Sequence, residues 1–89
     1  MQYEWDENKR VANLERHKID FTDADDFEWD TAIETIDDRY DYGEGRWVTI
    51  GFINKELHVM VYTIRGNKIR IISLRKANRR ESKYYEEKQ

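Results

Sequence analysis

The sequence predicts one α+β domain built on a twisted antiparallel sheet, and three observations support this fold class. The chain has 89 residues, the length of one small domain, so we assign residues 1–89 to a single unit. Its second half holds three β-forming segments joined by short turns, and its first half holds helical patterns behind capping residues. Hydrophobic residues make up 38% of the chain and charged residues 39%, which is too polar for a membrane protein.

The opening of the chain predicts a strand followed by a helix. Gln2–Trp5 is expected to be a short strand, after which the Asp6 carboxylate can cap a helix that runs to about His17. Val11 and Leu14 lie one turn apart on this helix and are expected to face the core. The residues on the neighbouring face, expected to be polar and basic, are Arg10, Asn13 and His17.

A second short helix is expected to begin after Thr22. The Thr22 hydroxyl, followed three residues later by Asp25, is an acidic variant of a capping box, and the helix places Ala24 and Phe27 inward. Residues 31–36 contain several β-branched residues and predict a further strand.

The second half of the chain predicts an antiparallel meander. Asp37–Gly45 combines acidic residues with two glycines and is expected to be a loop. The three strands that follow are expected at Trp47–Ile53, Leu57–Arg65 and Lys68–Arg75. Gly66 and Asn67 tolerate the positive φ of a two-residue hairpin turn, which sets the register. The pairs that follow are Arg65 with Lys68, Thr63 with Arg70, Val61 with Ile72 and, on the other face, Tyr62 with Ile71.

A last helix is expected from Lys76 to about Glu87, docked through Ala77 and Tyr84. The predicted order is therefore β-α-α-β-β-β-β-α. We expect the two early helices on one face of the sheet and the last helix at an edge.

Charge is distributed unevenly along the chain. Residues 1–44 hold 15 Asp and Glu against 5 Lys and Arg, a net of −10, whereas residues 45–89 hold 4 against 11, a net of +7. The two halves could simply neutralise each other on a solvated surface. The alternative is that the positive half binds an anion.

The predicted hairpin brings three cations together, which favours the anion alternative. Arg65, Lys68 and Arg70 share one end of one face, where like charges repel unless something neutralises them. Phosphate oxygens suit the planar fork of arginine, although Asp or Glu from the acidic half could cap the same cations. The positive charge continues through Arg75, Lys76, Arg79, Arg80 and Lys83.

Aromatic residues are interleaved with these cations and have two possible roles. Exposed rings could stack on unpaired RNA bases, but rings more often belong to the core. Of Tyr62, Trp47, Tyr84 and Tyr85, we expect Trp47 and Tyr84 to be buried.

RNA cleavage through the 2′-hydroxyl would need proton transfer and cations but no metal. His17 and Tyr62 are the candidates for proton transfer, although a histidine at a helix C-terminus can also be there for the helix dipole. His58 is assigned no role. With no cysteine and with two histidines far apart in sequence, we predict no metal site and no cofactor.

Two groups of residues resemble one known family. The opening group is Glu4-Trp5-Asp6-Glu7-Asn8-Lys9, followed by Arg16-His17, Ile19, Phe21 and Ala24. The later group is Asp41-Tyr42-Gly43-Glu44 with Arg46 and Ile50-Gly51, Val61-Tyr62-Thr63 with Arg65, and Ile69-Arg70-Ile71-Ile72-Ser73 with Arg75-Lys76-Ala77, Arg79-Arg80-Glu81 and Tyr84 or Tyr85. Together they resemble the BrnT family of toxins over nearly the whole chain. The chain departs from that family at Lys18, where glycine is common, and at Leu74, where a small residue is more usual.

With no cysteine and no pattern of a signal peptide, we expect a cytoplasmic bacterial protein. The resemblance implies a toxin of a bacterial type II toxin–antitoxin system, with a fold similar to the RelE-type ribonucleases, that cleaves RNA and halts translation. Its implied partner is a BrnA-like antitoxin with a ribbon-helix-helix part, and the hetero-oligomer would bind its own promoter DNA. The resemblance assigns functional roles to Arg65, Arg79 and Arg80, and also to His17.

The leading hypothesis is therefore a metal-independent endoribonuclease. Arg65, Arg79 and Arg80 would hold the scissile phosphate, and His17 or Tyr62 would move a proton. Further RNA contacts are expected from Lys9, Arg10, Tyr62, Arg70 and Arg75. The alternative is a non-catalytic module whose basic surface binds an acidic partner protein or RNA. A direct DNA-binding regulator is disfavoured by the acidic half.

Overall fold

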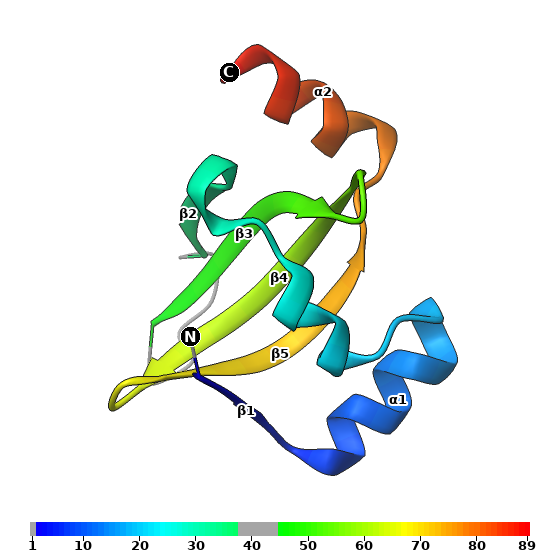
Figure 1. Ribbon diagram of the computed structural model, residues 1–89, viewed down its shortest axis with the longest axis vertical. Helices are drawn as coiled ribbons and strands as arrows, with labels where there is room; N and C mark the ends of the chain where they lie inside the picture. The colour runs from blue at the N-terminus through cyan, green and yellow to red at the C-terminus, as the bar shows by residue number, and fades with distance from the viewer. Residues whose placement is uncertain (1, 38–44) are drawn as a thin grey trace.

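The computed structural model describes residues 2–37 and 45–89, which form a five-stranded mixed sheet with helices. The elements in chain order are β1 (Gln2–Trp5), α1 (Glu7–His17), two short 3-10 helices η1 (Phe21–Asp26) and η2 (Trp29–Thr31), β2 (Ile33–Asp37), β3 (Arg46–Ile53), β4 (Glu56–Arg65), β5 (Lys68–Lys76) and α2 (Arg79–Glu87). Across the sheet the strand order is β1-β5-β4-β3-β2 (Figure 1). The predicted α+β class is confirmed, and most of the expected loop at 37–45 lies outside the described residues.

The sheet is not purely antiparallel, which corrects one prediction. β1 pairs with β5 in parallel, whereas the other three pairs are antiparallel. The hairpin rule fixes direction only for strands joined by a tight turn, and β1 meets a strand from the far end of the chain. Similarity to the RelE-type fold stays a prediction.

The first helix has the expected bounds and the expected cap. The Asp6 carboxylate accepts a hydrogen bond from the Asn8 backbone N–H at 2.8 Å. The helix ends at Lys18, which adopts a left-handed conformation with φ of 62°. This is the conformation that favours glycine after a helix, so it gives a physical reason for the glycine that is common at this position in the family resembled above.

The second predicted helix is instead the pair of 3-10 helices, and its cap was assigned to the wrong residue. Asp20, not Thr22, is the N-cap of η1, because its carboxylate accepts from the Thr22 backbone N–H at 3.0 Å. The Asp20 carboxylate, two residues before Thr22, therefore satisfies a free N–H group at the start of η1. Ala24 and Phe27 are buried as predicted.

The β4–β5 hairpin follows the predicted register only up to a β-bulge. Arg65 pairs with Lys68 and Tyr62 with Ile71, but Val61 pairs with Ser73 instead of Ile72. Ile72 is the extra residue of the bulge. Because the bulge shifts the alternation by one residue, the core side chains of β5 are Ile69, Ile71 and Leu74.

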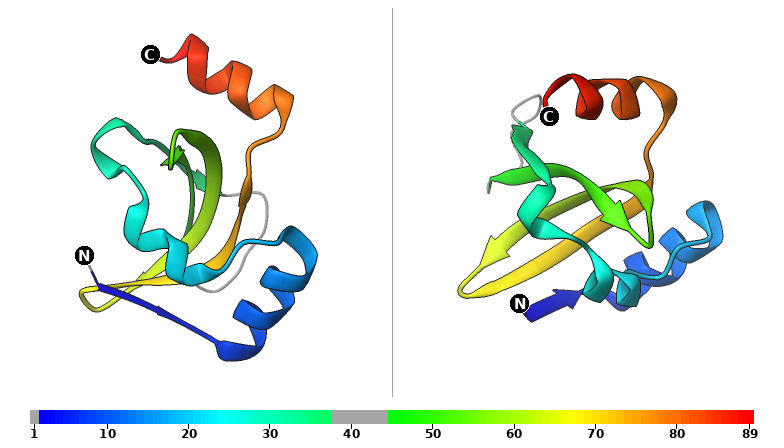
Figure 2. Two further views of the ribbon diagram at one scale, coloured as in Figure 1. Left: turned by 45° about the vertical axis from the view of Figure 1, so that its right-hand side comes forward. Right: turned by 45° about the horizontal axis from the view of Figure 1, so that its top comes forward.

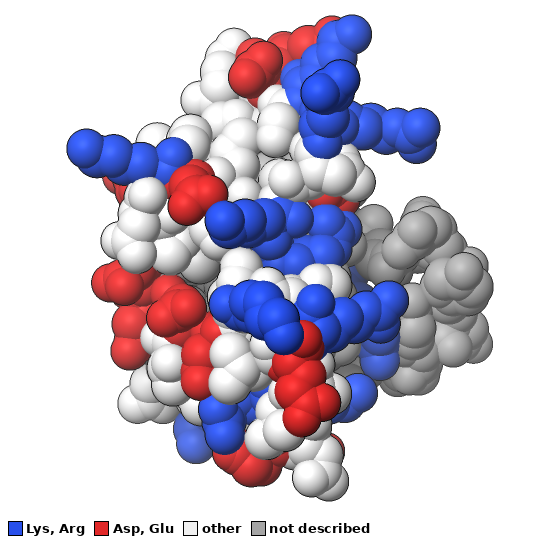
Figure 3. Space-filling view, turned by 90° about the vertical axis from the view of Figure 1, so that its right-hand side faces the viewer, with Lys and Arg blue, Asp and Glu red and all other residues white. Residues whose placement is uncertain are grey.

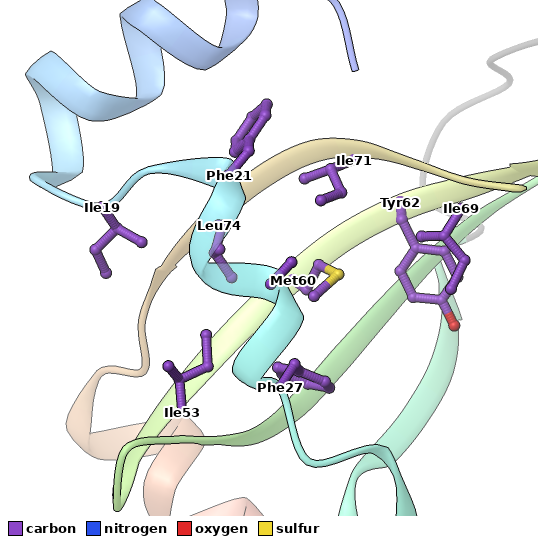
Figure 4. Close-up of a cluster of buried hydrophobic side chains, with 10 residues drawn as sticks. Ile19, Phe21, Phe27, Ile53, Met60, Tyr62, Ile69, Ile71 and Leu74 are labelled. Atoms are coloured by element: carbon purple, nitrogen blue, oxygen red, sulfur yellow. The ribbon is translucent and has the colours of Figure 1, made fainter. Parts of the chain in front are cut away.

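The main hydrophobic core lies between the sheet and the segment that carries η1 (Figures 2 and 4). Phe21 and Phe27 from this segment pack with Met60, Ile71 and other side chains of the sheet. A smaller cluster on the opposite face holds Ile50 and Val59, together with Tyr85 from α2. The sheet is therefore covered by η1 on one face and by α2 at one end of the other.

Two predicted details of α2 are wrong. The helix begins at Arg79, since Asn78 forms its N-cap and makes a capping box with Glu81. The buried tyrosine is Tyr85, which is 4% exposed and donates a hydrogen bond to the Thr31 carbonyl at 2.9 Å. Tyr84 is 42% exposed. Ala77 lies before the start of the helix, so the helical spacing from Ala77 to Tyr84 does not place Tyr84 on the buried face.

Helix α1 buries the face that was predicted to be polar. Val11 and Leu14 are 41% and 38% exposed, whereas Asn13 is 6% exposed. β5 continues past the end of β1, and Asn13 fills the place of the missing strand. Its Nδ2 donates to the Leu74 carbonyl at 2.8 Å, and its Oδ1 accepts from the Leu74 N–H at 3.1 Å. The same Nδ2 donates to the Ile19 carbonyl at 3.0 Å, so three backbone groups depend on one side chain.

We expect Asn13→Ala to lower the free energy of unfolding by about 3 kcal/mol, because buried backbone groups lose their partners. Urea denaturation measures the change. Asn8→Ala, an exposed asparagine of the same helix, is the matched control and should change stability by less than about 0.5 kcal/mol. Equal effects of the two substitutions would contradict this account.

Candidate functional site

A groove runs between α1 and β5, and two of its seven lining residues are cations. Its volume is about 190 Å³. The lining residues are Lys9, Ala12, Asn13, Arg16, His17, Ile72 and Ser73. Asn13 fixes α1 against β5, so residues three and four positions away on the helix face β5 beside it. The groove thus owes its shape to the buried amide described above.

His17, the last residue of α1, is the titratable group of this groove. Partial burial, and then the charges of Arg16 and Arg75, hold its pKa below the usual value. The imidazole is therefore mostly neutral at neutral pH and can accept a proton. An anion in the groove would lie next to this base.

Arg75 joins β5 to α2 by a bidentate ion pair with Glu81. Its two terminal nitrogens lie 2.8 and 2.7 Å from the Glu81 oxygens. Glu81 also accepts from the Asn78 N–H at 2.9 Å, which closes the capping box. The hydrogen bonds from Arg75 are the main cause of a lowered Glu81 pKa, and they raise the pKa of Arg75 in turn. Arg75 thus positions α2 while its charge acts on His17.

Arg79 and Arg80 are exposed in the first turn of α2, where the helix dipole disfavours positive charge. Within residues 2–37 and 45–89, neither arginine forms an ion pair, and the same is true of Lys9, Arg16 and Lys83. Figure 3 shows Lys and Arg side chains gathered on the side of the molecule that carries β5, α1 and the start of α2. An anion such as phosphate would relieve this repulsion.

Arg65 lies at the other end of β5 from Arg79 and Arg80. It is the last residue of β4 at the hairpin turn, whereas α2 follows the far end of β5 (Figure 1). Lys68–Lys76 spans roughly 25 Å as a strand. The structure does not bring the three predicted arginines to one phosphate.

Two other predicted RNA contacts are neutralised within the chain. Arg10 pairs with Glu7 and, at 2.9 Å, with Asp20. Arg70 pairs with Glu4 at 2.9 Å. The cationic cluster expected at the hairpin is thus partly capped by the acidic half of the chain, as the alternative explanation held.

Tyr62 lies outside this groove, on the face of the sheet that carries the main core. It is 2% exposed and donates a hydrogen bond to Glu34 at 2.6 Å. Burial, and then the Glu34 carboxylate, raise its pKa further above neutrality. The predicted base stacking and proton transfer by Tyr62 do not fit this position. Trp47 is half-buried against the core, and His58, which was assigned no role, is buried.

The sequence reasoning missed Arg16, Ser73 and Glu81 as residues of the site. Arg16 is three residues after Asn13, so it would have been found had Asn13 been placed on the buried face. Ser73 reaches the groove through the bulge, which no local pattern of the sequence marks. Glu81 could have been predicted, because it follows Asn78 at the spacing of a capping box.

Two searches for other kinds of site gave negative results. Among the residues that the structure describes, no group of three or more His, Asp or Glu side chains is placed to hold a metal ion. None of the helices in the described ranges is long and apolar enough to cross a membrane.

Comparison with known families assigns the chain. A family model described as "Ribonuclease toxin, BrnT, of type II toxin-antitoxin system" matches residues 5–81. The chain belongs to the BrnT family. The matched range covers nearly the whole chain and includes His17, Arg65 and the Arg75–Glu81 ion pair. A search of curated proteins gave no match.

The BrnT match also separates the two ends of α2. Arg79, Arg80 and Glu81 lie inside the matched residues, whereas Tyr85 lies outside them. The basic first turn and its ion pair to β5 are therefore within the family region, and the tyrosine that docks the rest of the helix is not.

We expect Glu81→Ala to lower the free energy of unfolding by about 1–2 kcal/mol at neutral pH, since it removes both the ion pair and half of the capping box. Glu81 has a lowered pKa in the folded state, so this contribution is present above the ordinary glutamate pKa and is lost as pH falls through the lowered value. Denaturation of parent and variant at a series of pH values measures it. Glu87→Ala, at the other end of α2, is the control, and a pH-independent difference would contradict the assignment.

Proposed function

We propose that this chain is a metal-independent endoribonuclease that acts as the toxin of a type II toxin–antitoxin system. The observation that carries the proposal is the neutral His17 beside cations in the α1–β5 groove. The BrnT family is one of ribonuclease toxins, which supports the same reaction class. A base beside a phosphate-binding groove meets the chemical needs of RNA cleavage through the 2′-hydroxyl.

In the proposed mechanism, His17 takes the proton of the 2′-hydroxyl as the 2′ oxygen attacks phosphorus. The bond from phosphorus to the 5′ oxygen breaks, and that oxygen takes a proton from water. The products are a 2′,3′-cyclic phosphate and a 5′-hydroxyl end. Arg16 and Lys9 face the phosphate in the groove and stabilise the charge that develops on its oxygens.

The remaining cations have supporting roles in this proposal. Arg79 and Arg80 extend the positive surface from the first turn of α2 and hold a phosphate of the bound strand. Arg75 orients α2, and its charge adds to burial and to Arg16 in lowering the pKa of His17. Arg65 contacts the RNA further along its backbone, because it lies a strand's length away.

The proposal also covers the setting of the reaction. Cleavage of RNA by this chain in the cytoplasm would halt translation. The neutralising partner would be a BrnA-like antitoxin with a ribbon-helix-helix domain, and the complex would bind its own promoter DNA. The family description, which names a toxin–antitoxin system, supports the existence of an antitoxin.

We expect the double variant Arg79→Ala/Arg80→Ala to cleave RNA at least about tenfold more slowly than the parent, because it removes two cations that hold the bound strand. Gel assays of purified protein on a labelled single-stranded RNA in excess EDTA measure the rate. Lys88→Ala, in which a cation is removed from the opposite end of α2 and outside the BrnT match, should leave it unchanged.

Two outcomes of this assay would overturn the proposal. If the parent does not cleave RNA in excess EDTA, the mechanism is not metal-independent. Equal cleavage by the parent and the double variant would leave the basic surface as a binding module for an acidic partner.

We expect the pH profile of cleavage to fall on its acid side with an apparent pKa below 6.5, the usual value for histidine. The rate declines there because His17 becomes protonated and cannot accept the 2′-hydroxyl proton. His17→Gln should lower the neutral-pH rate by about 100-fold and remove this decline. A decline that persists in His17→Gln would assign the base to another residue.

A further inference from the structure

A second groove lies on the face of the sheet that carries the main core, near the β4–β5 turn. Its volume is about 400 Å³, twice that of the groove beside α1. The residues that line it are Trp29, Glu34, Tyr62, Ile64, Asn67, Lys68 and Ile69. The proposed cleavage reaction uses none of them.

Apolar side chains on this face are exposed to an unusual degree. Ile64, in the groove, is 55% exposed, and Ile36 is 58% exposed. Ile36 lies two residues after Glu34 on β2 and therefore points to the same face. Its strand partner is Trp47, which in turn pairs with Tyr62. Ile36, Trp47 and Tyr62 thus form a row across three strands, and Ile64 lies next to Tyr62 along β4. Such apolar patches mark interaction sites.

The aromatic wall of the groove is held rigidly before any partner binds. Trp29 donates from Nε1 to the Tyr3 hydroxyl at 2.7 Å, and its ring packs edge-to-face on Tyr62 with centroids 5.5 Å apart. The Tyr62 hydroxyl is fixed in turn by Glu34. A preformed wall of this kind costs little entropy on association.

Two of the lining residues, Trp29 and Glu34, belong to a strongly acidic segment. Residues 20–36 contain seven Asp and Glu and no Lys or Arg. In the described part of the chain, Asp20 is the only one of the seven that forms an ion pair with a Lys or Arg. Lys68 is the one cation among the described residues that line the groove, and many of the other Lys and Arg side chains gather on the side of the molecule that carries α1, β5 and the start of α2. An RNA strand would be repelled here, whereas a positively charged polypeptide would be attracted.

We propose that this groove binds an amphipathic segment of the antitoxin, with apolar side chains against Trp29 and Ile64 and with Lys or Arg facing the acidic rim. The inference rests on the proposed function, since it takes the partner to be the antitoxin of this system. It adds a surface to that function. RNA and antitoxin then occupy separate grooves, one between α1 and β5 and the other near the β4–β5 turn.

The test uses the full chain and the purified protein encoded in the reading frame beside it. Calorimetry should give a dissociation constant at least tenfold weaker for Ile64→Glu than for the parent. Val11→Glu, the same change at an exposed apolar residue of α1, is the matched control and should bind within twofold of the parent. Both variants should cleave RNA at the parental rate, because neither residue lies in the α1–β5 groove.

The charge argument has its own test. Glu28→Lys/Asp30→Lys should weaken antitoxin binding in low salt, and the difference should shrink at high ionic strength. Glu86→Lys/Glu87→Lys, which reverses the charge of two exposed side chains of α2, is the control and should bind the antitoxin as tightly as the parent does.

Three results would overturn the inference. Ile64→Glu could bind as tightly as Val11→Glu, the neighbouring protein could fail to bind the parent, or the isolated chain could form a dimer that Ile64→Glu dissociates. The dimer would assign the groove to a second copy of the chain. The cleavage assay tests the proposed function separately. If Ile64→Glu binds the neighbouring protein more weakly than the parent does, and the parent has no ribonuclease activity, the binding groove is retained and the proposed enzymatic activity is refuted.

Discussion

A strand that extends beyond its neighbour leaves backbone groups without partners, and β5 extends beyond β1 in this way. β1 pairs with β5 only as far as Ile71, whereas β5 continues to Lys76. The Asn13 amide offers a donor and an acceptor in the arrangement of a strand backbone, so it satisfies Leu74 and holds α1 along the sheet. The position of His17, and of the cations beside it, follows from this one side chain.

The uneven charge of the chain becomes a division between two faces of the fold. Some acidic residues do neutralise basic ones, as in the pairs of Glu4 with Arg70 and of Glu81 with Arg75. The rest stay separate, because the acidic segment 20–36 crosses the face that bears the main core while α1 and α2 carry cations elsewhere. A protein with a modest net charge can therefore present an anion-binding surface and a cation-binding surface at once.

Local signals in the sequence were enough for much of the fold. The Asp6 cap, the turn at Gly66 and the β-branched runs predicted α1 and the strands, because each depends on residues close together in the chain. The wrong predictions concern features that depend on residues far apart in the chain. Val11 and Leu14 form an apolar pair at helical spacing, yet the sheet edge required a hydrogen-bonding side chain and Asn13 was buried instead.

The candidate site was predictable in kind but not in arrangement. Clustered arginines and His17 predicted phosphate chemistry, and the family is one of ribonuclease toxins. Whether Arg65 could meet Arg79 depended on the ends of β5 at which they lie, which is a property of the assembled sheet. The occupancy of Arg10 and Arg70 by carboxylates was likewise decided by strand and helix packing.

The bulge opposite Val61 and Tyr62 has a consequence for the floor of the α1–β5 groove. In a regular strand, consecutive residues would point alternately into the core and away from it. Here the extra residue lets Ile72 and Ser73, which are neighbours in sequence, both line the groove, while Leu74 returns to the core. The floor is thus two residues wide, with an apolar half and a hydroxyl half. A nucleotide bound in the groove would contact both halves, so its sugar and its phosphate could lie against side chains of different chemistry.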